Sequence, residues 1–95
     1  MLTRAERPTE RDVLDVVRQA VAVVLEVDAA SVERASTFAE LHADSLALVE
    51  VAEILEERFA PALRIPDAGL EALLTVGDAV DLTLAQMVVL PVDES

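Results

Sequence analysis

Apolar residues recur at every third or fourth position between residues 13 and 25, and charged residues at 12, 15 and 18 keep that period. The segment is rich in valine, but the helical period outweighs the preference of valine for strands. Thr9 precedes it with Asp12 three residues further on, which is the spacing of an N-terminal capping box. The pattern predicts an amphipathic helix of about four turns that ends near Glu26 to Asp28.

A second periodic segment predicts a helix from about Ser45 to Phe59. We expect Pro61 to end it, because proline has no N–H to donate to a helix. Its buried stripe is expected to consist of Leu48, Val51, Ala52, Leu55 and Phe59.

The remaining sequence predicts two further helices. A short one is expected after Pro66, over about Ala68 to Leu74, and the last begins at a second capping pattern at Thr75 and reaches about Val88. We expect Pro91 to stop it. The predicted fold class is therefore all-α, a small four-helix bundle with three longer helices and one short helix.

The connection between the first two helices is unusually long. From about Val27 to Asp44 there is no long periodic element, and loops beyond ~12–15 residues in compact domains are usually functional or disordered. Thr37 to Glu40 can cap one turn, with Phe38 and Leu41 holding it to the core. The loop delivers the chain to the head of the second helix, so that place is a candidate site.

Length and composition limit the possible functions. The 95 residues suit one domain, expected over 9–90 with flexible ends at 1–8 and 91–95. No cysteine is present, so the polypeptide offers no thiol nucleophile, disulfide or zinc knuckle; no metal site is predicted. No apolar stretch approaches the ~20 residues of a membrane span, and the N-terminus does not resemble a secretory signal. We expect a cytoplasmic monomer that binds no membrane.

The charge is strongly negative. Seven basic residues against 19 acidic ones give −12, and residues 1–18 sum to zero, so the remainder carries all of it. Such a surface repels a phosphate backbone, which argues against nucleic-acid binding, and it complements basic protein partners. The alternative is that the charge only confers solubility.

Several segments together resemble the acyl carrier protein family. They are the run from Phe38 to Leu46 with its Asp-Ser-Leu triplet, the acidic helix that follows, the Ile-Pro-Asp turn at 65–67 and the Thr-Val-Gly-Asp-Ala-Val segment at 75–80. The resemblance covers about residues 9–88. It implies that Ser45, flanked by Asp44 and Leu46, carries a covalent 4′-phosphopantetheine transferred from coenzyme A by a phosphopantetheinyl transferase. Alternatively, Asp44 or Ser45 is only a helix N-cap.

The resemblance also implies a docking surface on the second helix. Partners would be a ketosynthase, an acyltransferase or other acyl-processing enzymes with basic patches; on its own, such an acidic stripe indicates only a solvated face. Ala47 departs from the family pattern, because fatty-acid carriers often have an acidic residue two positions after the serine, and Glu53 stands where many carriers have an apolar residue. Both departures leave open which partners dock. The expected docking residues are Leu46, Val49, Glu50, Glu53, Glu56 and Glu57.

We expect a carrier rather than an enzyme. His42 lies three residues before Ser45, but no glycine-rich oxyanion loop accompanies them. The stretch 59–65 looks two residues longer than in fatty-acid carriers, and with Ala47 and His42 it favours a discrete carrier of a polyketide pathway over fatty acid synthesis. The alternatives are an unmodified acidic helical adaptor and an aminoacyl or peptidyl carrier. The sequence leaves the acyl group open.

Overall fold

The structure is a computed structural model that describes residues 9–60 and 63–87. The described residues form α1 (Glu10–Leu25), η1, a 3-10 helix (Ala29–Ser31), α2 (Ser45–Arg58), α3 (Asp67–Glu71) and α4 (Val76–Gln86). Within these ranges there is no strand, only two isolated bridges. The predicted all-α fold with three longer helices and one short helix is confirmed. The predicted flexible ends, and Pro61, Val88 and Pro91, lie outside the described residues.

Capping boxes begin two of the helices, as the sequence predicts. At α1 the Thr9 hydroxyl accepts a hydrogen bond from the Asp12 N–H at 3.1 Å, and the Asp12 carboxylate accepts one from the Thr9 N–H. At α4, Thr75 and Asp78 make the same reciprocal pair at 3.0 Å, and Asp78 also accepts from Leu74 N–H. The backbone N–H donors of Thr75 and then Leu74 lower the pKa of Asp78 below its ordinary value, because they stabilise the carboxylate.

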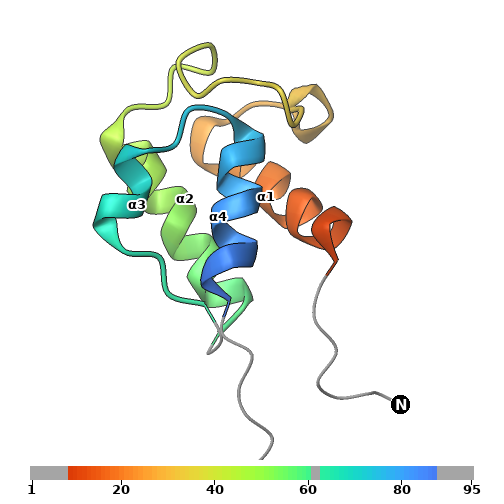
Figure 1. Cartoon of the computed structure of the whole chain (residues 1–95). Coiled ribbons are helices and arrows are strands. Elements are labelled where there is room, and N and C mark those ends of the chain that lie inside the picture. The colour runs from red at the N-terminus through yellow and green to blue at the C-terminus, as the bar shows by residue number, and fades with distance from the viewer. Residues whose placement is uncertain (1–8, 61–62, 88–95) are drawn as a thin grey trace, which may run out of the picture.

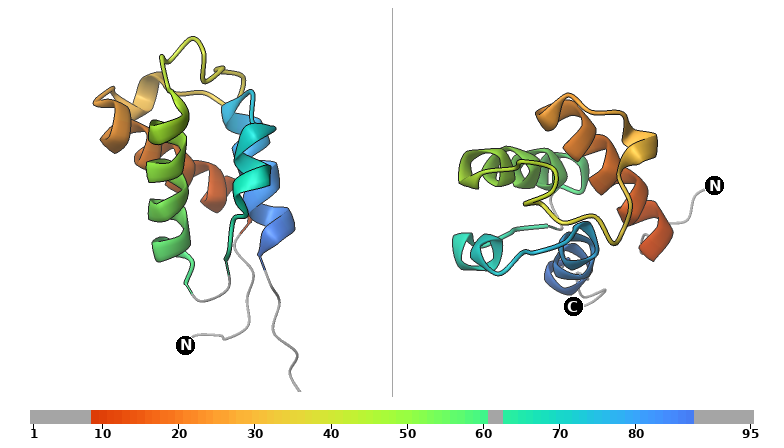
Figure 2. Two further views of the ribbon diagram at one scale, coloured as in Figure 1. Left: turned by 90° about the vertical axis from the view of Figure 1, so that its left-hand side faces the viewer. Right: turned by 90° about the horizontal axis from the view of Figure 1, so that it is seen from above.

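The helices pack with α1 across α2 and α4, and with α3 against α2. Figures 1 and 2 show α2 and α4 running in the same direction, with α1 crossing behind them. Burial of apolar side chains between these helices is the main source of stability. The core is almost entirely aliphatic and includes Val13, Val17, Val21, Val51, Leu55, Val76 and Val80, with Phe38 as its one buried ring.

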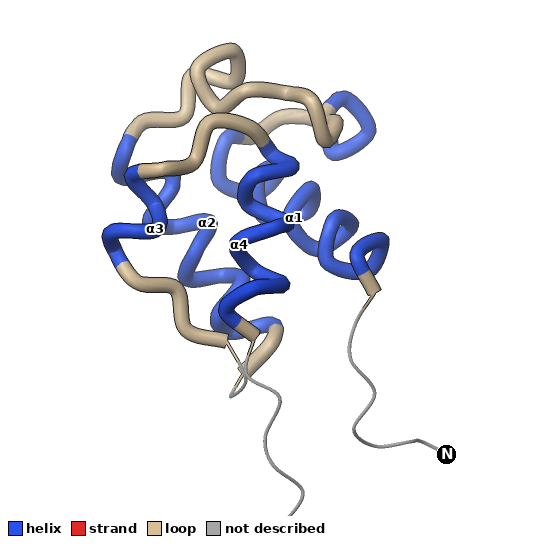
Figure 3. The backbone as a smooth tube through the Cα atoms, viewed as in Figure 1, coloured by secondary structure: helices blue, strands red, loops and turns tan. Residues whose placement is uncertain are grey.

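The long connection from α1 to α2 crosses the end of the bundle where α2 and α4 begin (Figure 3). It pairs with the segment before α4, since Phe38 N–H donates to the Leu74 carbonyl and Val76 N–H to the Ser36 carbonyl, both at 2.9 Å. Phe38 is buried and Leu41 half-buried, so the predicted attachment of this turn to the core is confirmed. The loop is therefore held in place above the head of α2.

Gly77 permits the closest of these approaches. Its N–H donates to the Arg34 carbonyl at 2.8 Å, and a Cβ at this position would lie 2.9 Å from Arg34 Cγ and 3.2 Å from that carbonyl oxygen. The Arg34 guanidinium also pairs with Glu10 at 2.6 Å and Asp81 at 2.9 Å. These half-exposed pairs contribute little energy each, but they tie the loop to both α1 and α4.

The predicted ends of two helices differ from the structure. α3 ends at Glu71 rather than Leu74, and the Leu74 carbonyl accepts a hydrogen bond from Phe38 N–H of the loop instead of continuing the helix. α4 ends at Gln86; the next residue, Met87, has an extended backbone and forms a bridge with Leu63. The η1 turn, capped by Asp28 through the Ala30 N–H at 3.0 Å, was not predicted. Within the described ranges, no helix is both long and apolar enough to cross a bilayer.

Candidate functional site

Asp44 caps α2, and Ser45 is the first residue of the helix. Asp44 has an extended backbone, its Oδ1 accepts a hydrogen bond from the Ala47 N–H at 2.8 Å, and its carbonyl accepts one from the Leu48 N–H at 3.0 Å. Of the two residues that could serve as the N-cap, Asp44 does so. The Ser45 side chain is not needed for the cap.

The Ser45 hydroxyl differs from the other hydroxyl groups of the described residues. Five of those are engaged in caps or turns: Thr9, Ser31, Ser36, Thr37 and Thr75. Thr83 is fully buried. Ser45 is exposed, and its hydroxyl makes no hydrogen bond within residues 9–60 and 63–87. Ser45 therefore carries the one hydroxyl of the described residues that is both exposed and free of a hydrogen bond.

The backbone around Ser45 suits a phosphate. The N–H groups of Ser45 and Leu46 belong to the first turn of α2 and have no acceptor among the described residues. Unpaired first-turn N–H groups and the positive end of the helix dipole favour a bound anion by about 0.3–1 kcal/mol at an exposed site. The head of α2, with an exposed serine and unpaired N–H groups, thus fits a phosphodiester on Ser45.

His42 lies in the turn before this site with φ of 61°, in the left-handed region. Its N–H donates to the Ala39 carbonyl at 3.1 Å, and Ala43 N–H donates to the Phe38 carbonyl, which closes the turn. A left-handed residue is least costly as glycine, so His42 occupies a position where its Cβ is unfavourable. The His42 side chain is exposed and makes no hydrogen bond to Ser45, so a Ser-His pair is not formed in the described structure.

The outer face of α2 carries most of the predicted docking residues. Leu46 is 65% exposed and Val49 38% exposed, and Ala47, Val51, Ala52 and Leu55 turn to the core instead. The carboxylates that share the outer face with these two apolar side chains are Glu50, Glu53 and Glu57.

Glu56 differs from these three. It is half-buried, and its Oε2 accepts a hydrogen bond from the Ile65 N–H at 2.7 Å. Glu56 therefore anchors the segment that leads from α2 to α3. The sequence held no signal for this contact, because it joins residues nine positions apart across a connection with no regular pattern.

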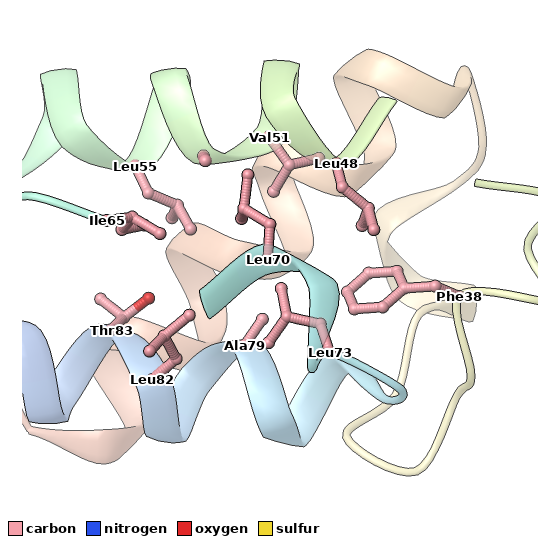
Figure 4. Close-up of a pocket in the computed structure, with 11 residues that line it drawn as sticks. Phe38, Leu48, Val51, Leu55, Ile65, Leu70, Leu73, Ala79, Leu82 and Thr83 are labelled. Atoms are coloured by element: carbon pink, nitrogen blue, oxygen red, sulfur yellow. The ribbon is translucent and has the colours of Figure 1, made fainter. Parts of the chain in front are cut away.

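A narrow apolar cavity lies between α2, α3 and α4 (Figure 4). Its volume is about 10 Å³, roughly enough for one water molecule. Leu48, one turn after Ser45, and Phe38 lie at one end of it; Leu55, Ile65 and Thr83 lie at the other.

Residues 15–83 match a protein-family model described as "Phosphopantetheine attachment site". The match spans well over half of the 95 residues. It contains α2 and the whole of the loop before it, α3, and most of α4.

Proposed function

The chain belongs to the family of phosphopantetheine attachment domains, and we propose that Ser45 is the residue to which the group is attached. Its cofactor is covalent 4′-phosphopantetheine, and the domain is a carrier. The observation that supports Ser45 most strongly is its exposed hydroxyl at the head of α2, left free because Asp44 provides the cap.

The attachment reaction is a phosphoryl-type transfer in which the chain supplies the acceptor. Ser45 Oγ forms the new P–O bond, the phosphoanhydride bond of coenzyme A breaks, adenosine bisphosphate leaves, and the hydroxyl proton passes to a base of the transferase. The unpaired N–H groups of Ser45 and Leu46 favour the phosphodiester once it is formed. When attached, the group supplies the thiol that the cysteine-free polypeptide lacks, and acyl groups are carried on it as thioesters.

The outer face of α2 is the proposed contact with partner enzymes. Leu46 and Val49 offer exposed apolar area directly after Ser45, and Glu50, Glu53 and Glu57 surround that area with negative charge. Basic patches on a transferase, a ketosynthase or an acyltransferase complement it, and complementary charge raises the rate of encounter more than the final affinity. Glu56 contributes charge at the same helix but is held by Ile65 N–H.

We propose a polyketide pathway as the setting. The proposal is based on the stretch 59–65 after α2, which is longer than in fatty-acid carriers, and on Ala47 and His42. Ala47, two positions after Ser45, is uncharged and buried. The acidic residue that fatty-acid carriers often have at this position is therefore missing from the surface of α2. A carrier for fatty acid synthesis remains the alternative within the family.

One experiment separates a carrier from an unmodified acidic adaptor. The protein is incubated with octanoyl-coenzyme A, Mg²⁺ and a broad-specificity phosphopantetheinyl transferase, and its intact mass is measured before and after treatment with hydroxylamine. A carrier gains the mass of one octanoyl-phosphopantetheine and then loses only the octanoyl part, because hydroxylamine cleaves a thioester and spares a phosphodiester. A mass that never changes would identify an adaptor.

A further inference from the structure

Thr83 is an unusual residue in the core of this protein. It is 0% exposed and is the one polar side chain among the buried residues of the described structure. Its hydroxyl oxygen finds no hydrogen-bond partner there. A buried hydroxyl without a partner is costly, and a valine would have filled the same space without that cost.

The Thr83 side chain lies at the end of the apolar cavity farther from Ser45. In Figure 4 it projects from α4 toward α2, on the side of Leu55 and Ile65, whereas Phe38 and Leu48 lie at the opposite end. Leu48 and Leu55 are seven residues apart on α2, about 10 Å along the helix axis, and Thr83 lies on the side of Leu55 (Figure 4).

Water is a poor partner for this hydroxyl. A buried water needs two to four polar neighbours, and the other side chains that line the cavity are all apolar. At about 10 Å³ the cavity has room for one water at most, which could bond to Thr83 and to no other side chain. A ligand that fits this site is therefore mostly apolar and has a single atom that can form a hydrogen bond with the Thr83 hydroxyl.

We infer that Thr83 selects an acyl chain bearing a ketone oxygen remote from the thioester, to which the Thr83 hydroxyl donates a hydrogen bond when the chain enters between α2, α3 and α4. This inference rests on the proposed function, because the chain enters while tethered at Ser45. The aliphatic lining holds the carbon chain, and the leucines that close the cavity, Leu70, Leu73 and Leu82, are only partly buried, so they can separate to admit it. A saturated chain of the same length would leave the hydroxyl unpaired.

The test compares matched acyl chains on matched proteins. Wild type, Thr83→Val and Thr83→Ser are each loaded by a phosphopantetheinyl transferase. The donors are octanoyl-coenzyme A and three oxo analogues of it, in which the ketone lies beside the thioester, at mid-chain or next to the terminal methyl. Intact mass verifies loading, and the readouts are the melting temperature relative to the unacylated holo protein and the rate of thioester cleavage by hydroxylamine. Failure to load would count against the proposed function and would be seen before either readout.

For wild type and Thr83→Ser, one of the two remote oxo chains should raise the melting temperature more than octanoyl does and be cleaved about tenfold more slowly, the factor that one buried hydrogen bond carries. For Thr83→Val, octanoyl should be protected better than any oxo chain, and the unloaded protein should melt higher than wild type. Equal preferences in wild type and Thr83→Val would overturn the inference. Loaded proteins with the same melting temperature as the unacylated holo protein would also overturn it. An unloaded Thr83→Val that melts lower than wild type would overturn it too, because that result would mean that the Thr83 hydroxyl is bonded to the Ala79 carbonyl one turn earlier.

Discussion

The carboxylate of Asp44 accepts a hydrogen bond from the backbone N–H of Ala47 at 2.8 Å, and this contact separates the role of the cap from the role of Ser45. Asp44 satisfies a first-turn donor of α2, and the neighbouring hydroxyl is left exposed. Of the two residues that the sequence offers as the N-cap of α2, Asp44 is therefore the cap and Ser45 takes no part in it.

Replacing Asp44 with alanine should destabilise the protein, because the Ala47 N–H loses its acceptor. The expected loss is about 1 kcal/mol in the free energy of unfolding, measured by urea denaturation. Asp44→Asn is the matched control, since its amide oxygen can accept the same hydrogen bond, and it should retain most of the stability. Equal stability of Asp44→Ala and wild type would show that the cap is not needed.

Replacing His42 with glycine should stabilise the protein. Relief of the left-handed backbone contributes about 1–2 kcal/mol, and the greater freedom of glycine in the unfolded chain offsets roughly 0.5–1 kcal/mol of it, for a net gain of about 0.5–1 kcal/mol by urea unfolding. His42→Ala, which keeps a Cβ at φ of 61°, should show no such gain. A gain of equal size for His42→Ala would mean that the imidazole side chain, and not the left-handed backbone, destabilises the protein at this position.

Asp78 should make stability depend on pH in acid. Its pKa is lowered in the folded protein by the N–H groups of Thr75 and Leu74, so its contribution is present above the unfolded pKa of about 3.9 and is lost as the pH falls through the lower folded value. The stability difference between wild type and Asp78→Asn should thus be largest near neutral pH and shrink as the pH falls below the unfolded pKa of about 3.9.

The matched control for this titration is Glu71→Gln, an exposed carboxylate that makes no hydrogen bond among the described residues. This variant removes one negative charge without removing a hydrogen bond, so it measures the effect of the charge change alone. A pH-independent difference for Asp78→Asn would mean that the carboxylate charge does not stabilise the cap of α4.

Local signals made most of this fold predictable. The capping pairs Thr9–Asp12 and Thr75–Asp78 each lie within four residues, and the helical period of apolar residues needs no knowledge of the tertiary structure. The position of Ser45 at the head of α2 follows from the same kind of signal.

Features that depend on contacts between distant segments were not predictable. The end of α4 is set by a bridge between Met87 and Leu63, and the contact of Glu56 with Ile65 N–H crosses an irregular connection. Thr83 occupies a helical position where threonine is ordinary, and only the tertiary structure shows that its side chain is fully buried and that its hydroxyl has no hydrogen-bond partner.

Charge reversal on the outer face of α2 should weaken partner enzymes without unfolding the protein. Glu50→Lys and Glu57→Lys should each raise the KM of a partner enzyme about two- to fivefold, the size of one exposed ion pair. The effect should fade with added salt, because exposed charges are screened over ~8–10 Å at ordinary ionic strength. Helical circular dichroism should be unchanged.

Glu33→Lys is the matched control for charge, since Glu33 is exposed on the long loop and its carboxylate has no ion pair within the described ranges. It should leave the KM nearly unaltered. Glu56→Lys is unsuitable for this comparison, because it also removes the acceptor of Ile65 N–H. If Glu33→Lys were as harmful as Glu50→Lys, net charge and not a docking face would govern the encounter.

The most direct measurement is the site of attachment. Wild type, Ser45→Ala and Ser36→Ala are each incubated with coenzyme A, Mg²⁺ and a broad-specificity phosphopantetheinyl transferase, and the products are analysed by intact mass and by fragmentation of the modified peptide. Ser36 is the control because its hydroxyl is already engaged by Glu33 N–H at 3.0 Å. We expect one phosphopantetheine on wild type and on Ser36→Ala, located at Ser45, and none on Ser45→Ala. Modification of Ser45→Ala, or the absence of modification from wild type with several transferases, would contradict the assignment of Ser45.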